Sequence, residues 1–315
     1  MKIGSTLAAL MLAAIAATPV AGNAANAVPD GTAIRYRHAT VDNIDIFYRE
    51  AGNPRAPTLL LLHGFPSSSA MFRDLMPLLA DRFHVVAPDY PGMGASEAPA
   101  ADKFKPTFDN LATVMTDFAV KLNLSNYILY MQDFGGPVGM RMAVRNPERV
   151  DGLIIQNSPV SLDGWDAKRL AAIQAGAAGP MTPEKRAAAA ARVVQATSNL
   201  LHQYGAAHPE QLNPDSWAVD AYALNDPDKR RIMTDLQLDI PSSLALYPAW
   251  QDYLRSRQPR TLVVWGRNDP IFAPNGGDVI KTLIPTADVH YYNTGHFALE
   301  ENGADIAGEI RRFFP

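Results

Sequence analysis

The sequence predicts an α/β fold: a mostly parallel sheet of about eight strands flanked by helices, with a helical cap inserted into it. Short apolar runs alternate with segments of helical periodicity over residues 32–159 and again over 254–315. Strands that alternate with helices build right-handed βαβ units and hence a parallel sheet. The intervening residues 160–253 contain alanine-rich helical segments, several prolines and no convincing strand. We therefore expect a core domain in two sequence parts and a cap domain between them.

Each expected element follows from a local pattern. Two β-rich runs on either side of Asp42 and Asn43 predict a hairpin. The later strands are apolar runs that end at glycine, proline or polar residues. We expect strands at residues 33–40, 44–48, 58–62, 84–87, 127–132, 152–156, 261–265 and 287–292. Helical patterns predict helices at residues 68–80, 108–122, 137–145, 183–194 and 306–314.

The composition is that of an ordinary globular protein and excludes several classes. Of the 315 residues, 47% are hydrophobic and 19% are charged, and the formal net charge is −4. No segment has the basic density of a protein that binds nucleic acid or an anionic membrane. The sequence has no cysteine and no paired histidines at metal-binding spacing, so we expect no zinc site. It also lacks a G-x-x-x-x-G-K-S/T phosphate loop.

Residues 1–27 have the pattern of a secretory signal peptide. Lys2 precedes an apolar stretch at residues 7–17, and Ala-Asn-Ala at residues 25–27 matches an A-x-A cleavage site. The stretch is shorter than the roughly 18 apolar residues of a membrane span. We expect a periplasmic or secreted protein that leaves the membrane after cleavage and has no disulfides. The alternative is an uncleaved N-terminal anchor.

Asp133 is the most informative residue of the chain. It ends the apolar run at residues 127–132 and is followed by Phe134, two glycines and Pro137. A strand, a sharp turn with a reactive side chain and a helix form a nucleophile elbow, usually with serine. A carboxylate is already ionised at neutral pH, so a histidine in the same site is free to activate water. We expect backbone strain at Asp133; the alternative is a simple helix N-cap.

Two later residues are candidates for the base and its partner. His296 follows the last expected strand, directly after Gly295, in a loop at the carboxyl edge of the sheet. Asp269 follows the preceding strand and is placed to accept the other imidazole N–H. The alternatives are a structural histidine and an aspartate that forms an Asx turn before Pro270.

Backbone N–H groups complete the expected site. An ester formed on a carboxylate develops negative charge on its carbonyl oxygen when water attacks it, and this charge needs donors. His-Gly-Phe-Pro at residues 63–66 follows a strand and places the N–H of Phe65 near the nucleophile. The N–H of Phe134 is the second donor. We interpret His63 as a structural residue of its loop.

Together these features resemble the α/β-hydrolase superfamily, and within it the Asp-nucleophile branch of epoxide hydrolases and haloalkane dehalogenases. The resemblance covers about residues 32–315, and the order nucleophile, acid, histidine matches that fold. Its motifs are His-Gly-Phe-Pro at 63–66, Gln-Asp-Phe-Gly-Gly at 132–136, Gly-Arg-Asn-Asp at 266–269 and Gly-His at 295–296. The resemblance implies a small-molecule substrate, no metal or organic cofactor, and a cap over the site. It also implies that the carboxylate displaces a leaving group and that activated water then hydrolyses the alkyl ester.

The two branches differ in how they stabilise the leaving group. For a dehalogenase, the resemblance implies halide-binding N–H groups at the positions of Phe65 and Phe134, whose side chains have none. Trp165, at the start of the cap, is a partial substitute. For an epoxide hydrolase, the resemblance implies cap tyrosines that protonate the alkoxide, for which Tyr247 and Tyr204 are the candidates. The alternative for both tyrosines is a structural role in the cap.

Hydrolysis of an epoxide to a diol is therefore the first expectation, because the usual halide donors are missing. Haloalkane or haloacid dehalogenation is the alternative. Further alternatives are an ester or lactone hydrolase with an atypical carboxylate and a non-catalytic ligand-binding protein of the same fold. The complete set of nucleophile, base and acid argues against the non-catalytic alternative.

Overall fold

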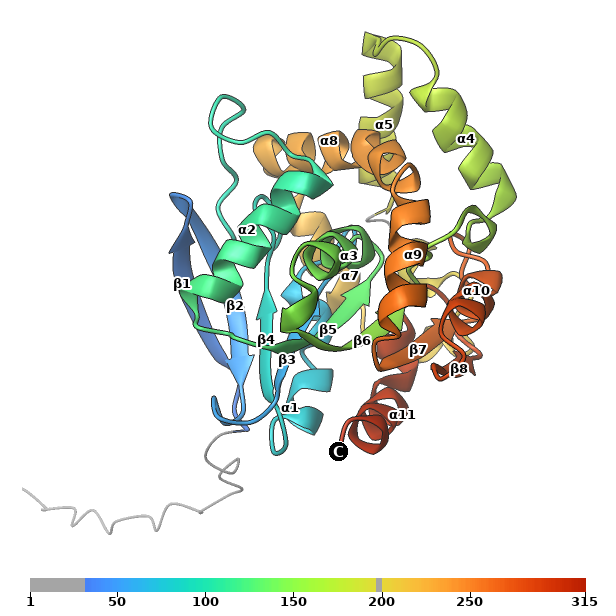
Figure 1. Cartoon of the computed structure of the whole chain (residues 1–315). Coiled ribbons are helices and arrows are strands. Elements are labelled where there is room, and N and C mark those ends of the chain that lie inside the picture. The colour runs from blue at the N-terminus through green and yellow to red at the C-terminus, as the bar shows by residue number, and fades with distance from the viewer. Residues whose placement is uncertain (1–31, 197–199) are drawn as a thin grey trace, which may run out of the picture.

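The computed structural model describes residues 32–196 and 200–315 (Figure 1). The expected signal peptide at residues 1–27 lies outside the described residues, and export remains a prediction. No helix in the described ranges combines the length and the hydropathy that a membrane crossing requires.

An eight-stranded sheet runs through the molecule in the order β1-β2-β4-β3-β5-β6-β7-β8. β2 pairs antiparallel with β1 and β4, and all other neighbouring strands are parallel. The strands are β1 (Arg35–Val41), β2 (Ile44–Ala51), β3 (Thr58–Leu62), β4 (His84–Pro88), β5 (Tyr127–Gln132), β6 (Val150–Gln156), β7 (Thr261–Gly266) and β8 (Asp288–Tyr292). The predicted fold class, a mostly parallel sheet of about eight strands, is confirmed.

Helices cover both faces of the sheet and form the segment between β6 and β7. Those packed against the sheet are α1 (Leu75–Leu79), α2 (Phe108–Lys121), α3 (Gly135–Arg145), α10 (Asn275–Leu283) and α11 (Ala298–Phe313). Those between β6 and β7 are α4 (Ala167–Ala177), α5 (Pro183–Ala196), α6 (Leu200–Gln203), α7 (Asp215–Ala223), α8 (Pro227–Leu244) and α9 (Tyr247–Arg257).

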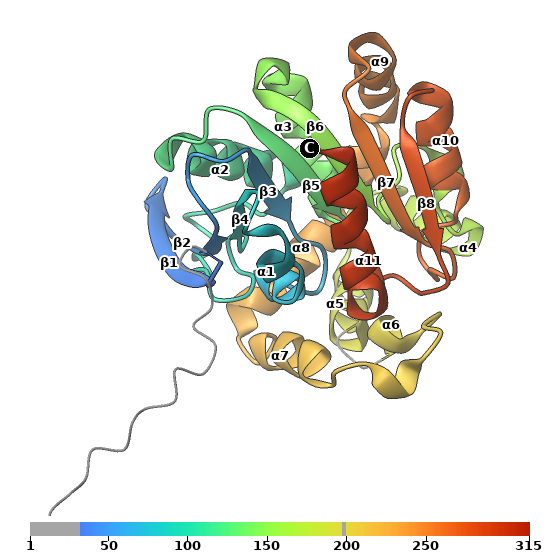
Figure 2. The ribbon, with the colours of Figure 1, turned by 90° about the horizontal axis from the view of Figure 1, so that it is seen from below.

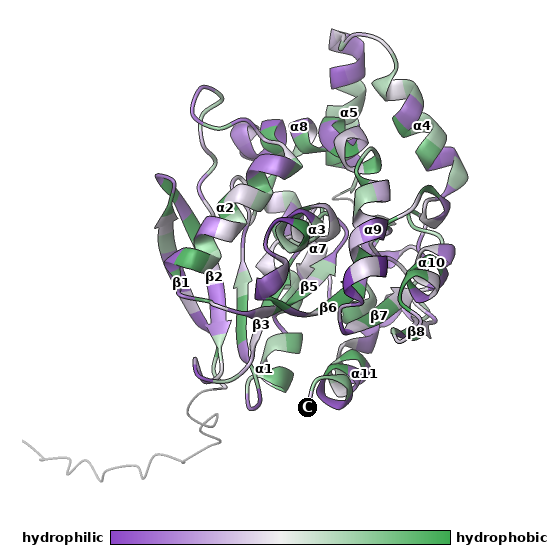
Figure 3. Ribbon diagram, viewed as in Figure 1, coloured by the Kyte–Doolittle hydropathy of each residue, from purple (hydrophilic) through white to green (hydrophobic). Residues whose placement is uncertain are grey.

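The two faces of the sheet bury alternate residues of the same strands. Leu60 and Leu62 of β3 belong to a core shared with α2, α3 and α10, whereas Leu59 and Leu61 belong to a core shared with α1 and α11. This alternation follows from the two-residue period of a strand. Figure 2 shows α1 and α11 on the opposite side of the sheet from α2, α3 and α10. In Figure 3 the central strands are mainly hydrophobic, as a strand covered on both faces requires.

The structure differs from the predicted helices at several places. The helix expected at residues 68–80 is a short 3-10 helix, Ser69–Phe72, followed by α1. Pro77 has no N–H to donate to the carbonyl of Arg73, which disfavours one continuous helix there. The sequence analysis missed α10 altogether. Its start, Asn275-Gly276-Gly277, consists of residues that are typical of a loop.

The segment between β6 and β7 contains no strand among its described residues. α4 and α5 both contact α8, and together these helices lie above the sheet in Figure 1. α9 extends beyond the expected cap boundary at residue 253, reaching Arg257, and it contacts α3 and α10. Helix α9 therefore crosses the expected boundary between cap and core. The cap boundaries remain a prediction.

Candidate active site

Asp133 lies at a sharp turn between β5 and α3. Its φ of +47° is in the left-handed region, which confirms the predicted strain and costs on the order of 1–3 kcal/mol. Gly135 allows this turn, because a Cβ there would lie 2.2 Å from the carbonyl oxygen of Leu62 on β3. Ser158 adds a further contact, since its hydroxyl donates to the backbone carbonyl of Asp133 at 2.9 Å. The turn is therefore held by close backbone packing and by a side-chain hydrogen bond.

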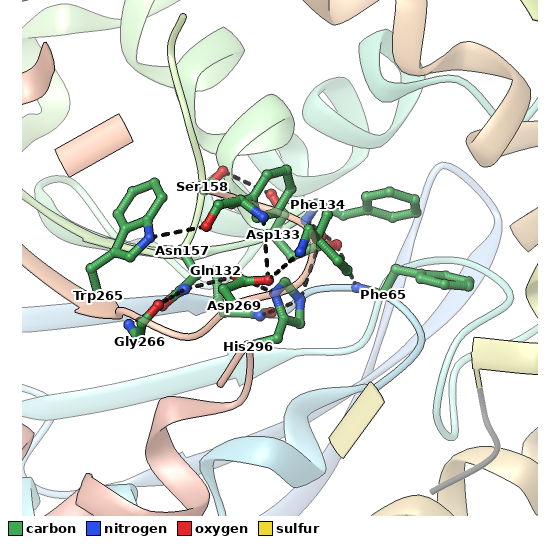
Figure 4. A network of polar contacts seen from close by, with 12 residues as sticks. Phe65, Gln132, Asp133, Phe134, Asn157, Ser158, Trp265, Gly266, Asp269 and His296 are labelled. Carbon is green, nitrogen blue, oxygen red and sulfur yellow. Dashed lines mark hydrogen bonds and ion pairs between the residues drawn. The ribbon is translucent and has the colours of Figure 1, made fainter. Parts of the chain in front are cut away.

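The two carboxylate oxygens of Asp133 have different surroundings (Figure 4). Oδ2 accepts hydrogen bonds from the backbone N–H groups of Phe65, at 2.9 Å, and Phe134, at 2.6 Å. Oδ1 lies 3.6 Å from Nε2 of His296. One oxygen is thus anchored between two donors, and the other is free to react.

Gly64 explains why the loop before Phe65 comes so close to the nucleophile. A Cβ at this position would lie 2.0 Å from Oε1 of Gln132 and 2.5 Å from Cβ of Asp133. Any larger residue would displace the loop, and the N–H of Phe65 would move with it. His63 is structural, as predicted: its Nδ1 pairs with the carbonyl of Gly64, and its Nε2 accepts from the N–H of Tyr90.

His296 and Asp269 form a buried hydrogen-bonded pair. Nδ1 of His296 lies 2.8 Å from Oδ2 of Asp269. The same oxygen accepts from Nδ2 of Asn157 at 2.8 Å, while Oδ1 accepts from the backbone N–H groups of Ile271 and Phe272. Four donors therefore fix the Asp269 carboxylate and, through it, the plane of the imidazole.

The neighbours of His296 define which of its nitrogens carries the proton. Nε2 lies 3.0 Å from the amide nitrogen of Gln132, a group that only donates. The Asp269 carboxylate, which only accepts, holds the proton on Nδ1, so Nε2 of the neutral imidazole has the lone pair. This is the tautomer that a base needs when it takes a proton from water at the Asp133 side.

Burial and charge shift the pKa values of both groups. Burial raises the pKa of Asp133 above its ordinary range, although the positive charge of His296 and the N–H of Phe65 oppose the shift. Burial alone would lower the pKa of His296, but the Asp269 carboxylate outweighs it and the net shift is upward. An elevated pKa makes His296 a stronger base.

A mostly apolar cavity of about 30 Å³ opens onto Asp133. It is lined by residues of the sheet side and of the helices between β6 and β7. These are Phe65, Phe108, Asp133, Phe134, Pro137, Ser158, Pro159, Trp165, Arg169, Gln237, Ile240, Ser243, Tyr247, Ile271 and Phe272. Such a site suits a small apolar reacting group.

Two of the three predicted cap residues lie in this cavity. The indole N–H of Trp165 donates to the hydroxyl of Tyr247 at 2.8 Å, and both side chains are buried. The prediction for the third, Tyr204, was wrong. This residue is 61% exposed and does not line the cavity. Tyr204 follows α6, and its backbone carbonyl packs against Gly295.

Three residues of the site were missed in the sequence analysis. Asn157 and Ser158 directly follow the apolar strand β6, the same signal that identified Asp133 and Asp269. A systematic search for polar residues at strand ends would have found both. Arg169 lies on α4, a helix without buried residues, and nothing in the sequence marks it.

One group of described residues has the spacing of metal ligands, but it lies away from the cavity. Single ligand atoms of Asp288, His290 and Glu309 lie within 4.8 Å of one another. The guanidinium of Arg312 forms ion pairs with both acids, so an arginine already supplies the positive charge there.

Comparisons with known proteins define the family. Residues 57–303 match the family described as alpha/beta hydrolase fold. An uncharacterised hydrolase of Saccharomyces cerevisiae is 35% identical over 87% of this chain and 94% of its own. Haloalkane dehalogenase 2 of Mycobacterium tuberculosis is 30% identical over 84% of this chain and 90% of its own.

Solved structures share the same fold. A haloalkane dehalogenase from Bradyrhizobium elkani superposes with a TM-score of 0.76 at 22% identity, covering 89% of this chain and 99% of its own. The ligand-free epoxide hydrolase CorEH gives a TM-score of 0.72 at 20% identity, with coverages of 90% and 99%. The chain therefore belongs to the α/β-hydrolase fold family and, within it, to the branch that resembles haloalkane dehalogenases. It is a hydrolase of this family.

Proposed function

We propose that this hydrolase opens small epoxides to diols through a covalent ester on Asp133. The observation that carries the proposal is the asymmetry of that carboxylate. Oδ2 is held by two backbone N–H groups, Oδ1 lies 3.6 Å from Nε2 of His296, and Asp133 lines the cavity. A serine nucleophile would need the histidine for its own activation, whereas Asp133 leaves His296 free to activate water.

In the first step, Oδ1 of Asp133 attacks an epoxide carbon and the ring C–O bond breaks. The hydroxyl of Tyr247 protonates the alkoxide. In the second step, Nε2 of His296 takes a proton from water, and the resulting hydroxide attacks Cγ of Asp133. The oxyanion then develops on Oδ2, between the N–H groups of Phe65 and Phe134.

The second step ends with release of the diol and restoration of each proton. The ester C–O bond breaks, and the departing oxygen takes the proton from His296. The carboxylic acid left on Asp133 loses its proton, which returns to the Tyr247 phenolate. The reaction sums to epoxide plus water giving a diol.

Tyr247 supports epoxide opening over halide displacement. Its oxygen accepts the N–H of Trp165, and its own proton has no acceptor among the described residues. Burial raises the pKa of Tyr247, so the hydroxyl remains protonated at neutral pH. The same hydrogen bond occupies the indole N–H that a halide would require. An alkoxide is more basic than a phenolate, so proton transfer from Tyr247 is favourable.

Dehalogenation is the second candidate, and one observation favours it. Haloalkane dehalogenase 2 of Mycobacterium tuberculosis is a 30% identical relative, and Arg169 provides a cation in the cavity for a departing halide. Both reactions would use the same covalent ester on Asp133.

The test compares Tyr247→Phe with the wild type on epoxides and haloalkanes of matched chain length. We expect kcat for epoxide opening to fall about 100-fold or more, because general-acid assistance is worth about 10²–10⁴-fold. Halide release should change little. Tyr253→Phe is the matched control, a buried tyrosine of the same helix that does not line the cavity. Equal losses on both substrate types would remove Tyr247 as the acid.

A further inference from the structure

A second cavity, of about 330 Å³, adjoins the one at Asp133 and shares Arg169 and Gln237 with it. It lies among α4, α5 and α8. The inner cavity, of about 30 Å³, holds little more than one or two water molecules. A substrate whose reacting carbon touches Asp133 therefore extends past Arg169 into the outer cavity.

The linings of the two cavities are strongly biased toward positive charge. Lys168 and Arg192 line the outer cavity, and Arg169 lies at the junction. Among the described lining residues, Asp133 is the one carboxylate. A path with three cations and a single anion attracts negatively charged ligands.

Arg169 is a cation whose guanidinium has no direct hydrogen-bonding partner among the described residues. Its backbone N–H donates to the side chain of Asp166, but its guanidinium forms no hydrogen bond or ion pair with any residue in the described ranges. The side chain is partly buried, and burial lowers its pKa against the opposing effect of Asp133 and Asp269. A desolvated charge without a partner costs free energy that a bound anion would recover.

We propose that Arg169 binds a carboxylate carried by the substrate, so that the enzyme prefers small epoxides bearing an acid group. This assignment of substrate class rests on the proposed reaction at Asp133. A guanidinium presents a planar pair of N–H donors that matches a carboxylate in a bidentate manner. Arg169 lies between the outer cavity and Asp133, so its positive charge also offsets the repulsion between the substrate carboxylate and the carboxylate of Asp133. Lys168 and Arg192 attract the substrate from solvent without touching the reacting part.

The kinetic test uses an epoxyalkanoate and its uncharged carboxamide of equal length. We expect wild-type kcat/KM to be about 10- to 100-fold higher for the acid, the range of a charged hydrogen bond. Arg169→Gln should abolish this preference, mainly through a rise in KM for the acid that the amide does not share. Arg169→Lys should retain part of it. Lys168→Gln, which alters only the outer cavity, should keep the preference.

Binding of unreactive ligands separates this inference from the proposed reaction. Calorimetric titration of the wild type with butanoate and butanamide should show tighter binding of butanoate, and Arg169→Gln should remove the difference. If butanoate binds no more tightly than butanamide while the epoxide amide is turned over, the proposed anion site is wrong and the proposed reaction is retained. If butanoate binds through Arg169 but no epoxide is opened, the proposed reaction is wrong and the proposed anion site is retained. An equal loss of kcat on both epoxides in Arg169→Gln would place Arg169 at the leaving group and overturn its role in binding a carboxylate.

Discussion

Asp133 combines three unfavourable features in one residue: a positive φ, burial and a negative charge. The structure offsets them with two backbone donors on Oδ2 and with His296 beside Oδ1. Burial nevertheless keeps its pKa raised. A residue of this kind reduces stability in order to hold a reactive group, which is common at active sites.

Replacement of this carboxylate should therefore stabilise the protein while it abolishes turnover. In Asp133→Asn, the neutral amide keeps its size but cannot attack carbon. We expect no measurable activity and a Tm above that of the wild type at neutral pH, by about 2–4 °C for each kcal/mol regained. Activity must be measured on fresh protein, since deamidation would regenerate the aspartate.

The sign of the pH effect follows from the raised pKa. An acid with a higher pKa in the native state than in the unfolded state is destabilising when it is ionised. That cost is complete above the native pKa and disappears below the unfolded value of about 3.9. The Tm difference between Asp133→Asn and the wild type should thus shrink as the pH falls. A difference that grows with acidity would contradict a raised pKa.

In the proposed mechanism, His296 acts in the second step alone. In His296→Gln, Asp133 keeps its donors and can still form the ester, but water activation by the imidazole is lost. We expect turnover to fall about 10²–10⁴-fold and the protein mass to increase by that of one substrate molecule. Intact mass spectrometry after mixing with substrate measures this. The double variant with Asp133→Asn should show no adduct, and an unmodified single variant would refute the ester intermediate.

At the scale of elements, the strands were the most predictable part of the fold. Their apolar runs are short, nearly continuous and bounded by turn residues, and β5 begins and ends where the sequence predicts. Helix boundaries were less predictable, because tertiary contacts decide them. α11 begins at Ala298 instead of residue 306, and its first part contains a non-helical Asn302 that weakens the periodic pattern.

The packing of α3 against β3 sets the position of the nucleophile and gives an element-scale prediction. Gly135→Ala would place a methyl group 2.2 Å from the carbonyl oxygen of Leu62, so helix and strand must separate. We expect a loss of stability of about 1–3 kcal/mol, together with reduced activity. Urea denaturation measures the change.

Gly308→Ala is the matched control for this substitution. Gly308 lies in the interior of α11, is exposed and has open space around its Cα. Alanine there should stabilise the protein by about 0.5–1 kcal/mol, as it does in most helix interiors. Equal stability of both variants would show that the contact between α3 and β3 does not constrain the elbow.

At the scale of the whole molecule, the sequence predicts the partners of Asp133 better than it predicts the substrate cavity. Asp269 and His296 follow strands, and parallel strands bring their carboxyl ends to one edge of the sheet. The cap offers no such rule. Tyr247 enters the cavity whereas Tyr204 faces solvent. Arg169 lines the cavity from α4, a helix with no buried residues to mark it in the sequence.

This difference explains why the fold and the reaction type are better defined than the substrate. The core positions the nucleophile, the base and the two N–H donors through backbone geometry. The helices between β6 and β7 supply Trp165, Arg169 and Tyr247, whose positions depend on how those helices pack together. In the proposed mechanism, these three side chains select the leaving group and the charge of the substrate.

The central claim is that the oxygen added to the product comes from the carboxylate of Asp133, which water then replenishes. A single turnover in ¹⁸O-labelled water, with enzyme in excess over an epoxide, tests it directly. The account predicts unlabelled diol and one ¹⁸O atom in the peptide that contains Asp133. Labelled diol with unlabelled enzyme after that first turnover would show direct attack of water on the substrate and would contradict it.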